Sequence, residues 1–207
     1  KCWDSLLSPL PNQYRSMVVT TGTGSGKTES FMVPLITDLA KKQNTQGLKA
    51  IFLYPLNALM EDQKEKLSKM IDASGSNLTF AVYNGASPET NDGERPEFYG
   101  RLDHELLYRE EIRGQKWNEQ TYRWENNGRI PDIILTNPTM LEYLLLRKAD
   151  EKIIGVSQDS LSWIVIDETH TYNGAGADEL AMLIRRVLNA FNKNAEDIHF
   201  ATSSATV

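Results

Sequence analysis

The sequence predicts an α/β fold with a mostly parallel central sheet. Short apolar runs rich in β-branched residues alternate with longer amphipathic stretches, which is the pattern of right-handed βαβ units. Two further observations agree with this class: a glycine-rich turn follows the first run, and two adjacent acidic residues follow a later one. Open α/β sheets place their ligand-binding turns at the carboxyl ends of the strands. The predicted strands are 16–20, 49–54, 78–83, 132–136, 162–167 and 198–202.

The clearest helix is predicted over 175–191. Its apolar residues recur at the helical spacing, so they should line one buried face. Pro34 falls inside another helix pattern, which starts near Gly26, and the missing backbone donor predicts a kink there. The residues of the helix predicted over 175–191 that should lie in the core are Leu180, Leu183, Ile184, Val187, Leu188 and Phe191.

Composition sets limits on the class of protein. The chain has 207 residues, of which 40% are hydrophobic and 24% charged, so it can bury one sizeable core. A net charge of −6 means that any nucleic acid must be bound in a local groove. The single cysteine, Cys2, excludes an internal disulfide and favours a reducing compartment. No apolar run is long enough to span a bilayer, so we expect a soluble, cytoplasmic protein without a membrane partner. Because it begins at Lys1, we expect a piece of something longer.

The turn TTGTGSGKTES, residues 20–30, is a candidate phosphate-binding loop. It lies between a predicted strand and a predicted helix, where inward-facing amides and the positive helix end can bind a chain of phosphates. Lys27 would supply a charge for the β- and γ-phosphates, and the Thr28 hydroxyl is a ligand for Mg²⁺. The common pattern has glycine where this chain has Thr21, and a plain glycine-rich turn is the alternative. Candidate nucleotide contacts are Thr23, Gly24, Ser25, Gly26, Lys27, Thr28 and Glu29.

A second motif, WIVIDETH at 163–170, places Asp167 and Glu168 at the end of an apolar strand. Asp167 can hold Mg²⁺ through water, and Glu168 can orient and deprotonate an attacking water. Adjacent acids after a strand are also common as a helix N-cap. Together with the glycine-rich loop, they predict the two halves of a site that hydrolyses ATP with Mg²⁺.

Further motifs follow in a fixed order along the chain. They are YPLNALMEDQ (54–63), YNG (83–85), TNPTMLEYLLLR (136–147) and SSAT (203–206). With the loop and DETH, these motifs resemble the first RecA-like lobe of superfamily 2 DEAD/DEAH-box-like helicases, in which the position of Thr21 need not be glycine. Their residues are most similar to those of Lhr-like and MrfA/YprA-like DNA helicases, including the helicase of DISARM phage-defence systems.

The resemblance implies a RecA-like P-loop three-layer sandwich and an ATP-dependent helicase. It makes 1–207 a single ATP-binding lobe with an insertion at about 86–130, and places the second lobe, with its arginine finger, outside this chain. The isolated piece should then be weakly active or inactive. Expected partners are that second lobe, single-stranded DNA or RNA, and further subunits. The implied catalytic residues are Lys27, Asp167, Glu168 and His170. Thr28 and Asp167 are the implied Mg²⁺ ligands. Ser204 and Thr206 are implied to couple the state of the bound ATP to the binding of the nucleic-acid strand.

Two other classes of function fit some of these residues. A nucleotide kinase also carries a phosphate loop, but it would need a substrate lid and has no use for SSAT. A non-catalytic module that binds nucleotide or nucleic acid is the second alternative for the isolated chain.

Predicted strand ends also supply a candidate nucleic-acid surface. Backbone amides and small polar groups there can grip phosphates without reading bases, as a motor requires. For each residue a cap or turn is the alternative, and Asn137 followed by Pro138 is also a good helix start. The candidate contacts are Pro55, Asn57, Gln63, Gly85, Thr136 and Asn137.

The segment 86–129 does not fit a compact βαβ unit. It carries ten acidic residues, seven basic residues and six aromatics. One interpretation is a mostly solvated helical excursion whose aromatics pack on one another or on the sheet edge. The other is a platform for stacking nucleic-acid bases, through Trp117 and Trp124 in particular.

Overall fold

The computed structural model describes residues 16–20, 26–42, 45–90 and 93–204. Six of the described strands form one sheet in the order β1-β8-β7-β2-β6-β3, and every neighbouring pair is parallel. All six predicted strands are present, with bounds that differ by at most two residues. They are β1 (Ser16–Thr20), β2 (Ala50–Leu53), β3 (Phe80–Tyr83), β6 (Ile133–Thr136), β7 (Trp163–Ile166) and β8 (His199–Ser204).

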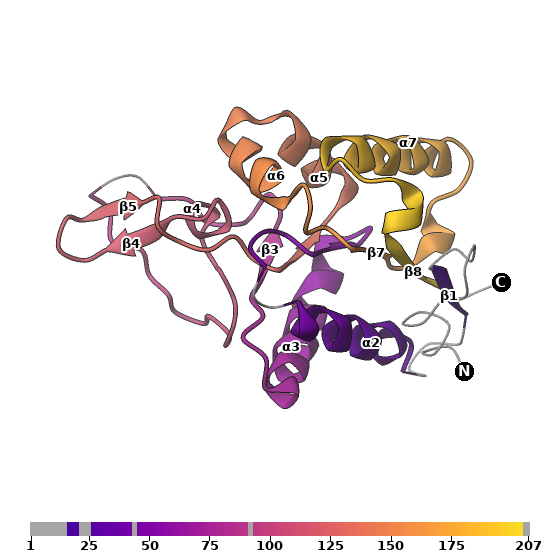
Figure 1. Ribbon diagram of the computed structural model, residues 1–207, viewed down its shortest axis with the longest axis horizontal. Helices are drawn as coiled ribbons and strands as arrows, with labels where there is room; N and C mark the ends of the chain where they lie inside the picture. Colours follow the sequence, from indigo (N-terminus) through magenta and orange to yellow (C-terminus); the bar gives the residue numbers. More distant parts are fainter. Residues whose placement is uncertain (1–15, 21–25, 43–44, 91–92, 205–207) are drawn as a thin grey trace.

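Helices cover both faces of this sheet and make a three-layer α/β sandwich (Figure 1). One face carries α2 (Lys27–Lys41) and α3 (Asn57–Ser74), and α3 ends where Gly75 takes the left-handed conformation, φ 64°. The other face carries α5 (Pro138–Leu146), α6 (Glu151–Ser157) and α7 (Ala175–Ala190). The described residues also form the 3₁₀ turns η1 (Lys148–Asp150), η2 (Thr169–Thr171) and η3 (Ala195–Asp197).

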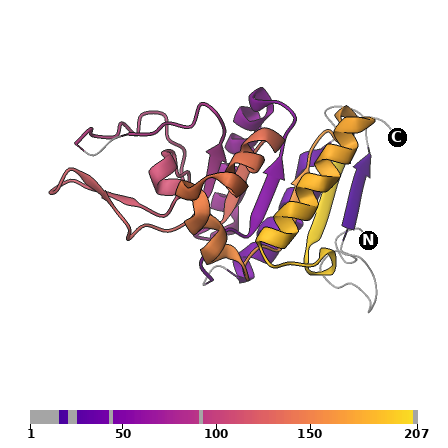
Figure 2. The same ribbon diagram turned by 90° about the horizontal axis from the view of Figure 1, so that it is seen from above.

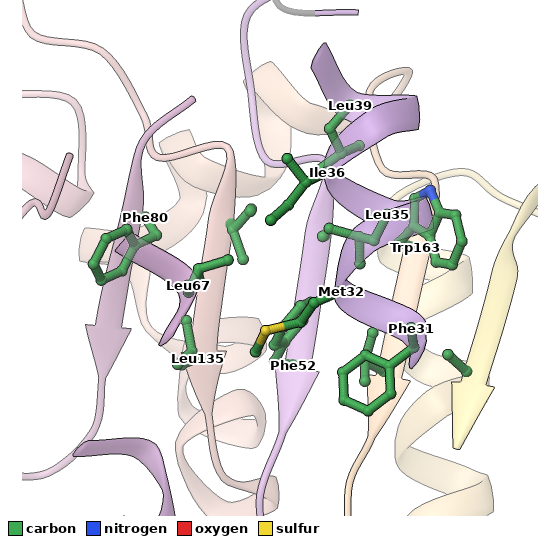
Figure 3. Packing of buried hydrophobic residues seen from close by; sticks show 14 of the residues in the cluster. Phe31, Met32, Leu35, Ile36, Leu39, Phe52, Leu67, Phe80, Leu135 and Trp163 are labelled. Atoms are coloured by element: carbon green, nitrogen blue, oxygen red, sulfur yellow. The ribbon is translucent and has the colours of Figure 1, made fainter. Parts of the chain in front are cut away.

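Each face of the sheet has its own apolar core. Under α2, Phe31 packs edge-on against Phe52 of β2, with ring centroids 6.2 Å apart (Figure 3). The helix continues through Pro34, which lies within its bounds. Under α7, the predicted core face is confirmed: Leu183, Val187 and Phe191 are buried, while Leu180, Ile184 and Leu188 are partly buried against the same cluster.

The order of strands brings distant motifs to one edge of the sheet. β8 comes last along the described chain, yet it lies between β1 and β7. Its register pairs Thr20 with Ser204 on one side and Ile166 with Thr202 on the other. The ends of β1, β8 and β7 therefore adjoin, and the ends of β2, β6 and β3 continue the same edge.

The segment 86–129 has little helix, so the expectation of a helical excursion is wrong for its described residues. It contains the single turn α4 (Arg109–Ile112) and a hairpin of β4 (Lys116–Asn118) and β5 (Arg123–Glu125). The hairpin projects beyond the β3 edge of the sheet in both views (Figures 1 and 2). Strands of three residues give no periodicity that a sequence pattern can reveal.

The expectation that its aromatics pack on one another is confirmed. Trp117 and Trp124 are cross-strand partners with ring centroids 5.5 Å apart, and Tyr108 lies 5.8 Å from Trp124. The Trp124 indole also donates a hydrogen bond to Thr90 Oγ1 at 2.8 Å. Tyr99, in contrast, is 96% exposed. The hairpin thus has a small aromatic core of its own.

Across the part of the chain that the structure describes, no helix combines the length and apolar composition needed to cross a membrane.

Candidate functional site

The glycine-rich loop leads into α2 through Gly26. Gly26 caps the helix with φ 78° and ψ 25°, a left-handed conformation that glycine adopts without strain. Ser30 donates hydrogen bonds to the Gly26 carbonyl from its backbone N–H, at 3.2 Å, and from its hydroxyl, at 3.1 Å. Thr28 is half-buried and Glu29 is exposed in the first turn. Because α2 begins at Lys27, the positive end of its dipole lies at Gly26, directly after the glycine-rich segment.

Some predicted site residues lie outside the described part of the chain. These are Thr23, Gly24, Ser25, Thr206 and the side chain of Lys27.

Asp167 lies one residue beyond β7 and is 8% exposed. Its Oδ1 accepts a hydrogen bond from the Ser203 hydroxyl and another from the Glu168 N–H, the latter at 3.0 Å. The described residues offer Oδ2 no hydrogen-bond donor. This arrangement fixes the carboxylate by one oxygen and leaves the other without a described hydrogen-bond donor.

Ser203 holds the DETH segment to β8. Besides donating to Asp167, its hydroxyl accepts from the Glu168 N–H at 3.3 Å, and its carbonyl accepts from the Thr169 hydroxyl at 2.8 Å. Ser203 is fully buried, and neighbouring Ser204 is 6% exposed. The sequence pattern singled out Ser204 and Thr206 and missed both Ser203 and Thr169. Ser203 and Thr169 could be recognised only from the register of β8 against β7, which the sequence alone does not reveal.

Glu168 has a backbone conformation that is rare for a residue with a side chain, φ 50° and ψ 48°. The turn that it begins is closed by the Thr171 hydroxyl, which donates to the Glu168 carbonyl at 2.8 Å. His170 is exposed, and its Nδ1 lies 3.1 Å from Glu168 Oε2. The two predicted catalytic side chains are therefore direct neighbours.

Two tyrosines lie within the electrostatic influence of Asp167. Burial raises the pKa of Tyr54 well above its usual range, and the negative charge of Asp167 raises it further. The pKa of Tyr172 is raised by the same two causes in the same order. Both phenols therefore remain protonated hydrogen-bond donors at neutral pH.

A hollow of about 600 Å³ adjoins this cluster at the ends of β2, β6 and β3. Four of the predicted nucleic-acid contacts line it: Pro55, Asn57, Gly85 and Asn137. It also takes residues that the sequence pattern did not single out for contact, namely Leu56, Pro138, Thr139, Met140, Thr171 and Tyr172. The structure thus brings the motif ends together in one groove beside Asp167.

Two of the predicted contacts do not belong to that groove. Thr136 is fully buried and its hydroxyl donates to the Tyr83 carbonyl at 2.7 Å, so the side chain supports β3 and cannot reach a ligand. Gln63 lies a turn and a half further along α3 and is absent from the lining. Asn137 is a helix cap, since its Oδ1 accepts from the Met140 N–H at 2.8 Å, while its amide donates to Asn57 at 2.8 Å.

The residues present fit a magnesium ion with its nucleotide. Mg²⁺ prefers oxygen ligands and keeps several waters, with one or two carboxylates and substrate phosphates completing the shell. Asp167 provides a carboxylate oxygen that no described donor occupies, and Thr28 provides a hydroxyl in the first turn of α2.

A parallel α/β sheet with a glycine-rich loop, an acidic pair and a serine-rich strand end on one edge defines a nucleotide-binding domain of the P-loop class. The model of the DEAD/DEAH box helicase family matches residues 1–207, and the chain belongs to that family. The fold is accordingly RecA-like, and the resemblance drawn from the motifs is confirmed.

Individual relatives agree with the family. The chain is 28% identical to the Druantia protein DruE of Escherichia coli, over 98% of this chain and 15% of DruE. It is 28% identical to the ATP-dependent helicase YprA of Bacillus subtilis, over 93% of this chain and 21% of YprA. Among solved structures, the helicase MrfA bound to DNA and AMPPNP superposes with a TM-score of 0.68 and 25% identity, over 100% of this chain and 23% of MrfA. The chain therefore spans less than a quarter of the length of these relatives.

Proposed function

We propose that this chain is the ATP-binding N-terminal lobe of a superfamily 2 motor that couples ATP hydrolysis to movement along DNA or to its unwinding. The observation that carries the proposal is the junction at Ser203, whose hydroxyl joins Asp167 and Glu168 to β8 beside the groove at the ends of β2, β6 and β3. Such a junction lets the ATP site and the groove move as one unit.

The roles of individual residues follow from their positions. Backbone amides at the amino end of α2 bind the phosphates, with Lys27 as their counter-charge. Asp167 Oδ2 and the Thr28 hydroxyl hold the magnesium shell. When bound, Mg²⁺ neutralises charge that develops on the transferred phosphate. Glu168, oriented by His170, accepts the proton of the attacking water.

The groove is proposed to hold the backbone of a single DNA strand, with RNA as the chemical alternative. Its lining is uncharged and includes the polar residues Asn57 and Asn137 and the small residue Gly85. These groups suit sequence-independent contact with phosphates and sugars. MrfA, whose solved structure holds DNA and AMPPNP, supports DNA as the first candidate.

We also propose that residues 1–207 act as one lobe, with the insertion at 86–130, and work with a second RecA-like lobe of the parent protein. An arginine finger from such a lobe is worth about 10³ to 10⁵ in rate. The isolated chain should therefore bind Mg²⁺ and ATP but turn it over slowly.

The test measures ATP turnover by the full-length parent protein with and without single-stranded DNA. Lys27→Ala and Glu168→Gln should each lower DNA-stimulated turnover by at least about 10²-fold. Lys27→Ala removes the positive charge that balances the phosphates, and Glu168→Gln removes the general base. Lys69→Ala and Glu65→Gln are matched controls, because both side chains are exposed on α3.

Unchanged turnover in both site variants would overturn the proposal. A wild-type protein that binds nucleotide and DNA without turnover would favour the non-catalytic binding module instead.

A further inference from the structure

The boundary between the ATP site and the groove lies where β7 meets β2. Their register pairs Leu53 with Ile166, and the Asp167 N–H donates to the Leu53 carbonyl at 2.9 Å. The next residue of the β2 segment, Tyr54, therefore lies beside Asp167. Pro55, which follows it, already lines the groove.

Tyr54 is fully buried, and its hydroxyl has no hydrogen-bond partner among the described residues. Its ring packs in the core under α2 and α3, with its centroid 6.5 Å from that of Phe52. An unpaired buried hydroxyl destabilises the fold in which it occurs, and phenylalanine would fill the same space without that cost. A hydroxyl at this place needs an explanation other than packing.

Tyr172 repeats the pattern from the opposite face of the sheet. It follows η2 directly after the DETH segment, and its ring packs against the core under α5 and α7. The ring also lines the groove, while its hydroxyl is buried and lacks a partner within the described ranges. Two buried phenols, one from each core, thus belong to segments that form the groove: Tyr54 neighbours Asp167 through the pairing of β2 with β7, and Tyr172 follows Asp167 in the chain.

We propose that Tyr54 and Tyr172 are positioning residues that couple the surroundings of Asp167 to the groove. When nucleotide is bound, their hydroxyls donate hydrogen bonds to oxygen atoms near Asp167. Engaging them shifts the backbone at Pro55 and the ring of Tyr172, both of which line the groove. This inference rests on the proposed function, because it requires a nucleotide at Asp167 and a strand in the groove.

Coupling of this kind is measurable as a ratio of affinities. If nucleotide changes the affinity for a DNA strand by some factor, the strand changes nucleotide affinity by the same factor. In the full-length protein, the Kd for a fluorescein-labelled oligothymidine is measured with and without Mg²⁺ and AMPPNP, and the ratio of the two values is the coupling.

Tyr54→Phe and Tyr172→Phe should each move that ratio towards one by about two- to tenfold, the value of one hydrogen bond. Tyr108→Phe is the matched control, because its buried hydroxyl already bonds the Glu97 backbone in the insertion, at 2.7 and 3.1 Å. The control should keep the wild-type ratio. Wild-type ratios in both site variants would overturn the inference.

Thermal denaturation supplies a second readout that does not depend on DNA. Without ligand, Tyr54→Phe should keep or raise the Tm, whereas Tyr108→Phe should lower it, because only Tyr108 has a bond to lose. With Mg²⁺ and AMPPNP, the rise in Tm should be smaller for Tyr54→Phe than for wild type. A lowered Tm without ligand would assign the Tyr54 hydroxyl to packing and refute the coupling role.

The two proposals fail differently. A wild-type protein whose Tm does not rise with Mg²⁺ and AMPPNP would refute the proposed function. A normal rise in wild type that Tyr54→Phe leaves unchanged would refute the coupling role of Tyr54 alone.

Discussion

At the scale of the residue, Ser203 determines the geometry of the acidic pair. Its hydroxyl donates to Asp167 and accepts from the backbone of Glu168, and its carbonyl receives the Thr169 hydroxyl. All three partners belong to the DETH segment. A small side chain on β8 therefore fixes the residues that would meet the metal and the attacking water.

Ser203→Ala should lower DNA-stimulated ATP turnover of the full-length protein by about tenfold or more, since Asp167 loses its side-chain donor. The free energy of unfolding should fall by about 1–3 kcal/mol, as a buried carboxylate oxygen loses a bond. Turnover assays and urea denaturation measure the two effects.

Ser157→Ala is the matched control for this prediction. Ser157 is fully buried, accepts from the Leu48 N–H at 2.8 Å and donates to the Ile153 carbonyl, far from the acidic pair. It should lose comparable stability while keeping wild-type turnover. Equal turnover in Ser203→Ala and Ser157→Ala would show that Ser203 has no role in the ATP site.

The candidate site could be predicted from the sequence only where neighbours along the chain are neighbours in space. Asp167 and Glu168 follow a strand, and Gly26 precedes a helix, so local pattern was enough for both. Ser203 reaches Asp167 only because Ile166 pairs with Thr202 in the register of β7 and β8. The Thr136 hydroxyl is unavailable to a ligand for a similar reason, because it donates to the Tyr83 carbonyl of the neighbouring β3.

At the scale of the element, the hairpin of β4 and β5 depends on its aromatic side chains. Trp117 is 8% exposed and contacts Trp124 and Tyr122, with centroids 5.5 and 6.3 Å away. A two-stranded hairpin is marginal in water without such packing. The structure therefore favours packing over base stacking for these tryptophans.

Trp117→Ala should loosen the hairpin, because a buried aromatic contributes about 3–5 kcal/mol to local stability. Amide hydrogen exchange in 116–125 should quicken by at least about tenfold. Tyr99→Ala, at an exposed aromatic of the same segment, should leave exchange unchanged. If Trp117→Ala instead weakened strand binding with normal exchange, base stacking would be the better interpretation.

At the scale of the whole molecule, the segment 86–129 is bound to the sandwich through the buried carboxylate of Asp150. Arg113 of that segment lies 2.8 Å from Asp150, which also accepts from the Tyr83 hydroxyl, and 2.6 Å from the half-exposed Glu89 of the same segment. Burial alone would lower the pKa of Arg113, but its hydrogen bonds to Asp150 and Glu89 raise it. Burial and the bond to Asp150 raise the pKa of Tyr83 to about 12.

Arg113→Ala should lower the free energy of unfolding by about 3–5 kcal/mol, since Asp150 is fully buried and would keep an uncompensated charge. Arg95→Ala is the control, because its pair with Glu119 is exposed and worth at most about 1 kcal/mol. Guanidinium denaturation measures the free energy of unfolding of both variants. Similar losses in Arg113→Ala and Arg95→Ala would mean that the pair of Arg113 with Asp150 does not anchor the segment 86–129.

The layers of the molecule could be predicted, but the order of the strands could not. Alternating strands and helices, with the apolar face of α7, were sufficient for a parallel sandwich. Nothing in the sequence places β8 between β1 and β7, because that order depends on contacts between the two ends of the chain. The segment 86–129 was mistaken for helix because its order comes from ring contacts across a short hairpin.

That position of β8 has a consequence for biosynthesis. Among the described strands, β1 is hydrogen-bonded to β8 alone, with Ser16 opposite Phe200. While the ribosome is still adding β2, β3, β6 and β7, the first strand therefore lacks its neighbour and must wait for nearly the last described residues to emerge. Closing so long a loop is entropically costly and slow. Because β1 pairs with no other described strand, newly made chains should gain ATP affinity only after β8 has been translated.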